Sequence, residues 1–127
     1  PDQQLVQFFT EDYEIMFNGE TVEILIPVAS IKSNINGENW IAGPAYLDEK
    51  NNPFLKFHSS NVEVVPNGRF QFVADGDMKS TNFVFNSCRL AFNKTEDDGK
   101  IYGHLIFNKP DHFDEEIEVS RVRIRIE

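Results

Sequence analysis

Residues 13–26 read YEIMFNGETVEILI, and this stretch indicates the fold class of the whole chain. On both sides of Asn18-Gly19, apolar side chains alternate with polar ones, so that each segment has one apolar face. A period of two is typical of a β-strand that is buried on one side. Asn-Gly accepts the backbone angles that a tight hairpin turn requires. The stretch therefore predicts two antiparallel strands joined at Asn18-Gly19.

Short segments of similar character follow one another along the chain, and none shows a convincing helical period. The candidate strands besides this hairpin are residues 5–9, 40–47, 54–57, 62–65, 70–73, 82–92, 101–107 and 117–126. Asn, Asp, Gly and Pro are frequent between these segments, as expected of turns. In the longest segment the alternation slips by one residue at Asn86-Ser87, which predicts a β-bulge there.

The pattern predicts a single all-β domain over residues 1–127, with about eight or nine strands. We expect an antiparallel β-sandwich, either jelly-roll or immunoglobulin-like, because many short strands separated by turns are typical of that architecture. A closed β-barrel of the lipocalin-like type is the alternative. The 127 residues are an ordinary length for one domain. The twelve phenylalanines suit a core between facing strands.

Charge narrows the classes of partner. The chain has 12 Lys and Arg residues against 21 Asp and Glu residues, which gives a formal net charge of −9. A net negative field repels phosphate backbones, so we expect no nucleic-acid partner. No apolar run approaches the roughly 18 residues of a membrane-spanning helix, so we expect no membrane insertion.

Three arginines alternate with apolar residues near the C-terminus. Arg121, Arg123 and Arg125 therefore stand on one face of a predicted strand. A basic stripe of this kind is able to grip an anionic polymer, but the acidic net charge argues against that use. We expect these arginines to pair with carboxylates on a neighbouring strand, such as Glu14 or Glu23.

The single cysteine, Cys88, excludes an intrachain disulfide. It lies in an apolar segment, and unpaired cysteine is among the most buried residue types, so we expect it in the core. A chain without disulfides fits a reducing compartment or a bacterial exported protein. An exported or cell-surface location is therefore compatible with the sequence.

Acidic residues cluster in a predicted loop at residues 111–116. Asp111, Asp114 and Glu115 place three carboxylates close together there, and they are the predicted metal ligands. Calcium is the expected ion, because it takes about six to eight oxygen ligands and loops of this kind supply them. The spacing does not match the helix–loop–helix calcium loop, and a solvated Asp-rich turn is the alternative interpretation. No other cofactor is expected.

Two aromatic residues flank the break at Gly43-Pro44. Trp40 and Tyr46 follow the polar stretch 30–38, which predicts a long loop. Exposed Trp and Tyr side chains stack on sugar rings or anchor protein partners. These two residues are therefore the predicted ligand-binding residues, and burial in the core with their polar tips at the rim is the alternative.

No catalytic motif is present. The sequence has no G-x-S-x-G and no glycine-rich phosphate loop. Its three histidines are far apart and form no metal-binding spacing. We therefore expect that the chain is not an enzyme. The leading hypothesis is a non-catalytic binding module that recognises carbohydrate or another surface ligand, with a carbohydrate or a protein as its partner.

Two alternative functions are compatible with the same pattern. The first is a structural or interaction subunit of a surface or viral assembly, because strands at both termini are able to pair across subunits. A homo-oligomer fits this hypothesis. The second is a small hydrophobic ligand carrier of the lipocalin-like type, in which phenylalanines would line a barrel cavity.

Overall fold

The structure, a computed structural model, describes residues 6–33, 38–113 and 120–127. Within these ranges the strands are β1 (Val6–Thr10), β2 (Glu14–Phe17), β3 (Val22–Pro27), β4 (Lys32–Ser33), β5 (Phe54–Ser59), β6 (Val62–Val64), β7 (Phe72–Lys79), β8 (Val84–Lys94), β9 (Ile101–Asn108) and β10 (Arg121–Ile126). Two short 3₁₀ turns, η1 (Val28–Ser30) and η2 (Trp40–Ala42), accompany them. The prediction of an all-β chain is confirmed. The described part of the chain contains no helix with the length and apolar character needed to cross a membrane.

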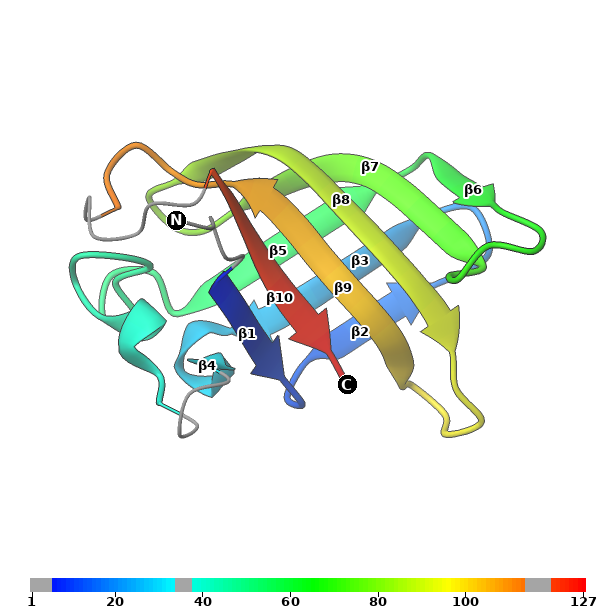
Figure 1. Cartoon of the computed structure of the whole chain (residues 1–127), viewed down its shortest axis with the longest axis horizontal. Helices are drawn as coiled ribbons and strands as arrows, with labels where there is room; N and C mark the ends of the chain where they lie inside the picture. Colours follow the sequence, from blue (N-terminus) through cyan, green and yellow to red (C-terminus); the bar gives the residue numbers. More distant parts are fainter. Residues whose placement is uncertain (1–5, 34–37, 114–119) are drawn as a thin grey trace, which may run out of the picture.

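Hydrogen bonds join the described strands into one sheet. Its order is β2-β3-β5-β7-β8-β9-β10-β1-β4, and β6 pairs with β7 beside this path. The sheet curls, so that β8, β9, β10 and β1 lie across β2, β3 and β5 in the view down the shortest axis (Figure 1). The curved strand β7 lies between these two sides. The result is a half-barrel whose concave side holds the core.

This architecture agrees with the sequence-based expectation in part. A two-sheet β-sandwich is not confirmed, because the strands on both sides belong to one hydrogen-bonded sheet. A closed barrel is compatible in part: the sheet curls, but its end strands β2 and β4 do not pair with each other in the described ranges. One expectation was wrong, since β1 and β10 pair in parallel and not antiparallel. The two terminal strands thus pair with each other within the chain.

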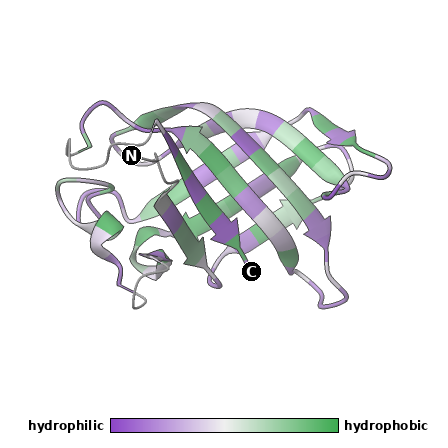
Figure 2. Ribbon diagram, viewed as in Figure 1, coloured by the Kyte–Doolittle hydropathy of each residue, from purple (hydrophilic) through white to green (hydrophobic). Residues whose placement is uncertain are grey.

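Side chains on the concave side pack against one another across the half-barrel. The ring of Phe17 on β2 lies edge-on to Phe72 and Phe92, at centroid distances of 4.9 and 5.1 Å. The rings of Phe72 and Phe92 stack at 5.2 Å. Alternate residues of β3, β5, β9 and β10 are buried, and Figure 2 shows the corresponding alternation of hydrophobic and hydrophilic positions. Burial of this apolar surface drives folding, at about 25 cal/mol per Å².

The hairpin predicted at Asn18-Gly19 is confirmed, because β2 and β3 pair antiparallel. The connection is residues 18–21, which makes it four residues long and not two. Gly19 has φ +95°, a left-handed conformation that favours glycine. The side-chain oxygen of Asn18 accepts hydrogen bonds from the backbone N–H groups of Glu20 (2.9 Å) and Thr21 (2.8 Å). Asn18 therefore holds the turn through its side chain.

The β-bulge predicted at Asn86-Ser87 is also confirmed. The pairing of β8 with β7 shifts by one residue between Phe85 and Cys88, and Ser87 has φ +55° there. Both Phe85 and Cys88 are buried. The extra residue thus brings the two phases of the alternation to one buried face.

Residues 40–47 do not form the predicted strand. The segment begins with η2 and continues as turns, because Pro44 follows Gly43 and has no N–H group for a strand ladder. Ile41 and Leu47 are fully buried, and the N–H of Leu47 donates to the carbonyl of Ile41 at 2.9 Å. We call residues 40–52 the end plug, because they cover one end of the half-barrel (Figure 1, left).

A buried amide fastens the end plug to the sheet. Asn52 is fully buried. Its Oδ1 accepts hydrogen bonds from the Ser80 hydroxyl (2.9 Å) and the Asn82 N–H (2.8 Å), both in the β7–β8 connection. A buried amide that is bonded in this way fixes the position of the plug, since leaving it unpaired would cost stability.

Candidate ligand-binding site

Trp40 begins η2 and lies at the surface of the end plug. Its ring contacts Phe8 of β1 and Tyr46 of the plug edge-on, at centroid distances of 5.3 and 5.0 Å. Phe8 is buried in the core, so this contact ties Trp40 to the sheet. The Trp40 side chain is only partly buried. One part of the side chain therefore packs on the core and another part is accessible, so that Trp40 lies between the two predicted alternatives of an exposed binding residue and a core residue.

A hollow of about 530 Å³ opens beside Trp40, and we call it the plug hollow. Its walls are Asn39, Trp40, Ala42, Gly43, Pro44, Asp48, Glu49, Lys50 and Asn51. The volume lies within the range of small-molecule sites, about 300–1,000 Å³. One aromatic wall and several polar side chains suit a ligand that has both apolar faces and hydroxyl groups.

Hydrogen bonds fix the polar side of the plug hollow. Asp48 has φ +53°, and its N–H donates to the carbonyl of Gly43 at 3.0 Å. Its Oδ2 accepts a hydrogen bond from Nδ2 of Asn51 at 2.9 Å. Because a carboxylate has about four acceptor positions, this bond orients Asp48 and still leaves acceptor capacity for a ligand.

Tyr46, the second predicted binding residue, is not part of the wall of the plug hollow as the structure describes it. Its ring lies between those of Trp40 and Phe113, at centroid distances of 5.0 and 5.6 Å. Its carbonyl oxygen accepts a hydrogen bond from Nε2 of His112, 2.9 Å away. His112 in turn stacks on Phe83 at 4.0 Å. Tyr46 therefore supports Trp40 from behind and connects the plug to the residues after β9.

The predicted calcium ligands fall only in part on described residues. Asp111 is exposed and lines a separate hollow of about 400 Å³ together with His112. Asp114 and Glu115 lie outside the described residues. Within the described ranges, no group of three or more His, Cys, Asp or Glu side chains is arranged to hold a metal ion. Calcium binding at this loop stays a prediction.

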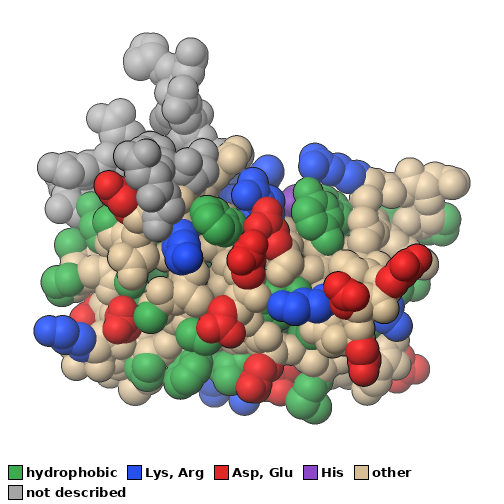
Figure 3. Space-filling model, turned by 90° about the horizontal axis from the view of Figure 1, so that it is seen from below, with side chains coloured by type: hydrophobic (Ala, Val, Ile, Leu, Met, Phe, Trp, Pro, Cys, Tyr) green, Lys and Arg blue, Asp and Glu red, His purple; other side chains and the backbone are tan. Residues whose placement is uncertain are grey.

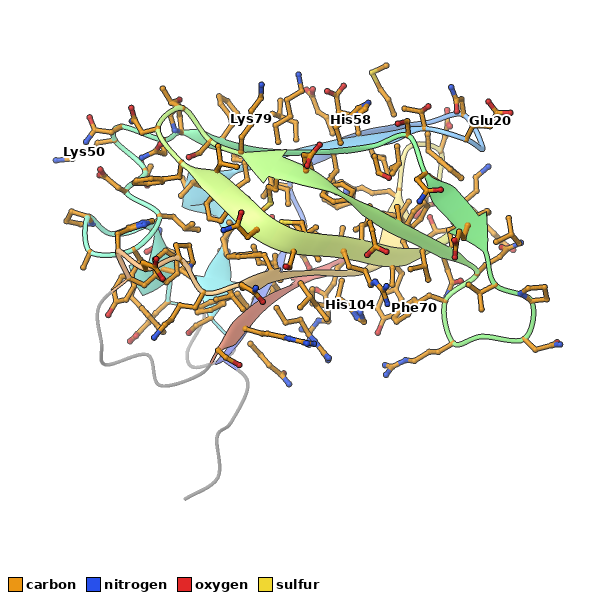
Figure 4. The ribbon with its side chains drawn as sticks, turned by 90° about the horizontal axis from the view of Figure 1, so that it is seen from above. Glu20, Lys50, His58, Phe70, Lys79 and His104 are labelled. Atoms are coloured by element: carbon orange, nitrogen blue, oxygen red, sulfur yellow. The ribbon has the colours of Figure 1, made fainter. Side chains whose placement is uncertain are left out.

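The histidines lie in different parts of the molecule. Figure 4 shows His58 and His104 on opposite sides. His58 and its neighbour Ser59 follow each other on β5 and point to opposite faces of the sheet. The Ser59 hydroxyl donates a hydrogen bond to the carbonyl of Asp75 at 2.7 Å. These two residues therefore do not form a serine–histidine pair.

The arginine stripe of β10 lies on the outer face of the sheet, and the expected partners were wrong. β10 lies between β9 and β1, so that Glu14 on β2 and Glu23 on β3 are not on neighbouring strands. Glu23 pairs instead with Lys56 at 2.9 Å. Arg125 pairs with Glu127 at 2.7 Å. The sequence alone did not reveal the strand order that decides these partners.

The outer face carries more positive charge than the stripe alone. Arg69, from the β6–β7 connection, and His104 of β9 line one hollow together with Arg123 and Arg125. With Arg121, these residues form what we call the basic face. In Figure 3, Lys and Arg side chains (blue) lie at the upper edge of the molecule, around a histidine (purple). Burial lowers the pKa of His104, and the positive charges of Arg123 and Arg69 lower it further.

Cys88 is buried, as predicted. Burial raises the pKa of its thiol to about 12, and the negative charge of Asp77 adds to the shift. A thiol that stays protonated at neutral pH is a poor nucleophile and a poor metal ligand. Cys88 is therefore a packing residue.

The fold and the plug hollow define an all-β protein with a curled sheet and an open polar hollow at one end. Solved structures of the YceI protein of Campylobacter jejuni share this fold: one has a TM-score of 0.60 and 14% identity, and the match covers 99% of this chain and 84% of that chain. A mutant of that protein for nanotechnology applications gives a TM-score of 0.61 at 15% identity, with the same coverage. At this identity the similarity shows the fold alone. No family model matches the sequence, and no curated protein matches it.

Proposed function

We propose that this chain is a non-catalytic binding protein whose ligand is a carbohydrate that lies against Trp40 in the plug hollow. The observation that carries the proposal is the composition of that hollow. Its wall contains the only tryptophan of the chain together with the polar residues 48–51. A sugar ring presents C–H groups that pack on an aromatic face, and hydroxyl groups that pair with carboxylates and amides. Trp40 supplies the aromatic face, and Asp48 and Asn51 supply the polar groups.

The plug hollow is organised before a ligand arrives. Phe8 and Tyr46 contact the Trp40 ring, and the side chains of Asp48 and Asn51 hold each other by a hydrogen bond. A preorganised site loses less conformational entropy on binding than a flexible one. This supports binding by residues that lie in turns and not in strands.

Two further observations favour this proposal over the alternative functions. Phe17, Phe72 and Phe92 contact one another inside the half-barrel, so these phenylalanines pack on each other instead of lining space for a hydrophobic ligand. β10 pairs with β9 and β1, and β1 pairs with β10 and β4. The terminal strands therefore have strand neighbours on both sides within the chain, which removes the motivation for an assembly partner at these strands.

Trp40 makes the test direct, because fluorescence from the only tryptophan of the chain reports on the plug hollow. We expect at least one member of a glycan set to change the Trp40 emission in a saturable way. Asp48→Asn keeps a residue type that tolerates positive φ while it removes the charge. Because a hydrogen bond to a charged group contributes about 1.5–3 kcal/mol, we expect this variant to bind the glycan about tenfold or more weakly.

Phe54→Ala is the matched control, because Phe54 is an exposed aromatic residue outside the wall of the hollow. Calorimetry should show unchanged glycan binding for this control and lost binding for Trp40→Ala. If Trp40→Ala does not fold, Trp40→Phe replaces it as the test variant. It keeps an aromatic ring packed on the core and should also weaken glycan binding. The proposal fails if no glycan at millimolar concentration changes the emission, or if Asp48→Asn and Trp40→Phe both bind like the wild type.

A further inference from the structure

The basic face carries charged side chains that the glycan site does not use. In Figure 4, Lys50 of the plug hollow lies at the upper left, whereas His104 and Phe70 lie on the lower side. The two regions therefore lie on different parts of the surface. A ligand of the basic face would therefore bind independently of the proposed glycan site.

Some arginines of the outer face already have carboxylate partners. Arg125 pairs with Glu127 at 2.7 Å. Arg89 of β8 holds Asp75 through two hydrogen bonds, of 2.8 and 3.1 Å, and this pairing lowers the pKa of the Asp75 carboxyl. Bidentate pairs of this kind satisfy both charges. These arginines are therefore neutralised within the protein.

The other arginines of the face have no carboxylate partner in the part of the chain that the structure describes. Within residues 6–33, 38–113 and 120–127, no carboxylate lies within salt-bridge distance of Arg69, Arg121 or Arg123. The guanidinium of Arg69 lies over the ring of Phe70, 5.3 Å from its centroid, a contact that holds the side chain without cancelling its charge. Arg69, Arg121 and Arg123 thus make this face locally positive, although the chain as a whole has a net charge of −9.

Arg123 also carries a donor that no described residue pairs. Its Nε atom is buried and makes no hydrogen bond within the described part of the chain. Buried N–H groups are almost always hydrogen-bonded in native proteins, because an unpaired one costs its full desolvation. The side chain that carries this unpaired donor also lines a hollow of the basic face.

Arg69 and Arg123 both line a hollow of about 190 Å³ on the basic face. Arg69, Arg123, Arg125 and His104 contribute to its lining, and Tyr102 adds an aromatic side chain that is 42% exposed. Arg69 and Arg123 thus meet at His104, whose pKa is lowered first by burial and then by these two positive charges. An anion would relieve this repulsion among like charges.

We propose that this hollow binds the phosphate group of a small phosphomonoester. A phosphate dianion matches the two guanidinium groups of Arg69 and Arg123, whose planar forks pair with phosphate oxygens. The small volume fits one such group, and Tyr102 and Phe70 beside it provide an aromatic wall for the organic part of the ligand. A nucleic-acid chain is disfavoured, since the net charge of −9 would repel the rest of a polyanion.

Phenyl phosphate, inorganic phosphate and phenyl sulfate are suitable probes, measured by calorimetry on the full chain at constant ionic strength. We expect phenyl phosphate to bind and to raise the melting temperature, and inorganic phosphate to compete with it. Phenyl sulfate, a monoanion, should bind more weakly. Equal binding of phenyl sulfate and phenyl phosphate would overturn the assignment to phosphate, and no binding of any probe at millimolar concentration would overturn the site.

Arg123→Gln should weaken the binding of phenyl phosphate at least tenfold, because it removes the positive charge of a side chain that lines the hollow. Arg69→Gln, a change in a connection between strands, should also weaken it and tests the site if Arg123→Gln fails to fold. Lys79→Gln is the matched control: it removes the same formal charge on the opposite side of the molecule (Figure 4), and binding should change less than twofold. Equal losses in Lys79→Gln and Arg69→Gln would mean a general charge effect and would overturn the site.

Discussion

Tyr13 joins two segments that are far apart in the sequence. It lies between β1 and β2 and is buried. Its hydroxyl donates a hydrogen bond to the carbonyl of Ile101 at 3.0 Å and accepts one from the N–H of the same residue, also at 3.0 Å. Because Ile101 begins β9, this side chain fastens the connection between β1 and β2 to the opposite side of the half-barrel.

Replacing Tyr13 by Phe should therefore destabilise the fold. The change removes one hydroxyl and leaves two buried backbone groups of Ile101 unpaired, which costs about 1–3 kcal/mol in the free energy of unfolding. Urea unfolding followed by circular dichroism measures this loss. Tyr102→Phe is the control, because Tyr102 is exposed and should lose almost nothing. A free energy of unfolding that is equal in both variants would show that the hydroxyl of Tyr13 is not a fastening point.

The sequence predicted the candidate site only in part. Trp40 could be singled out because the chain has no other tryptophan and Gly43-Pro44 follows it. The role of Tyr46 could not be separated from that of Trp40, because only the folded plug decides that one ring lines the hollow and the other packs behind it. Asp48 could not be singled out from the sequence, since an Asp in a turn is common for backbone reasons.

At the level of strands, the alternation of apolar and polar residues predicted those features that neighbouring residues decide. The hairpin at Asn18-Gly19 and the bulge at Asn86-Ser87 follow from local pattern and turn chemistry. The segment 40–47 misled the prediction, because its apolar residues are buried by a compact set of turns and not by a sheet. Burial alone does not distinguish these two arrangements when the run is short.

The pairing between distant strands could not be predicted. β1 and β10 lie at opposite ends of the chain and pair in parallel, a choice that depends on how the whole sheet curls. The same strand order decides that the arginines of β10 face β9 and β1 and not the carboxylates of β2 and β3. The wrong expectation about Glu14 and Glu23 thus has the same cause as the wrong expectation about strand direction.

The bulge in β8 allows a test of how much one left-handed backbone angle lowers the free energy of unfolding. Ser87 has φ +55°, a left-handed conformation that costs a residue with a side chain about 1–2 kcal/mol. Ser87→Gly removes this cost but adds disorder to the unfolded chain, so we expect a net gain of up to about 1 kcal/mol in the free energy of unfolding. Ser87→Val, with a β-branched side chain, should lose stability.

Chemical denaturation of the two Ser87 variants measures these changes. The buried neighbours Phe85 and Cys88 are unchanged in both, which keeps the comparison to the backbone of one residue. Because Cys88 is protected in the folded state, its reaction with a thiol reagent should remain slow in both variants and serves as a check that the bulge persists. Loss of stability in Ser87→Gly would mean that the side chain, and not the angle, is needed there.

For the molecule as a whole, net charge and charge arrangement lead to different conclusions. The sum of −9 argued against an anionic partner, yet the fold places Arg69 beside Arg123 and Arg125 of β10, which are far from it in the sequence. A sum over the chain holds no information on which faces carry which sign. This is why the basic face emerges only when the strand order is known.

The stability of the whole molecule should depend on pH through His104. From β10 the charged groups Arg123 and Arg125 face it, and from the β6–β7 connection comes Arg69. The residue paired with it on β8 is Ala91, which has no charge. Arg121, and Asp75 and Arg89, which pair with each other, line a second hollow together with His104. The proton that changes hands near neutral pH on this face is therefore that of His104.

The direction of the effect follows from the lowered pKa of His104, which burial causes first and the two arginines increase. In the unfolded chain His104 returns to its ordinary value of 6.5, so below that pH the unfolded chain takes up a proton that the folded chain does not. The free energy of unfolding should thus fall as the pH decreases below about 6.5, and the stability that neutral His104 contributes is fully present above that pH.

Urea unfolding at about pH 7.5 and 5.5 measures this effect. The difference in the free energy of unfolding between the two pH values should be smaller for His104→Gln than for the wild type. His58→Gln, a change of an exposed histidine on the opposite side, should retain the wild-type difference. If His104→Gln retains it as well, the charges of the basic face do not converge on His104, and the electrostatic support for the phosphate site is lost.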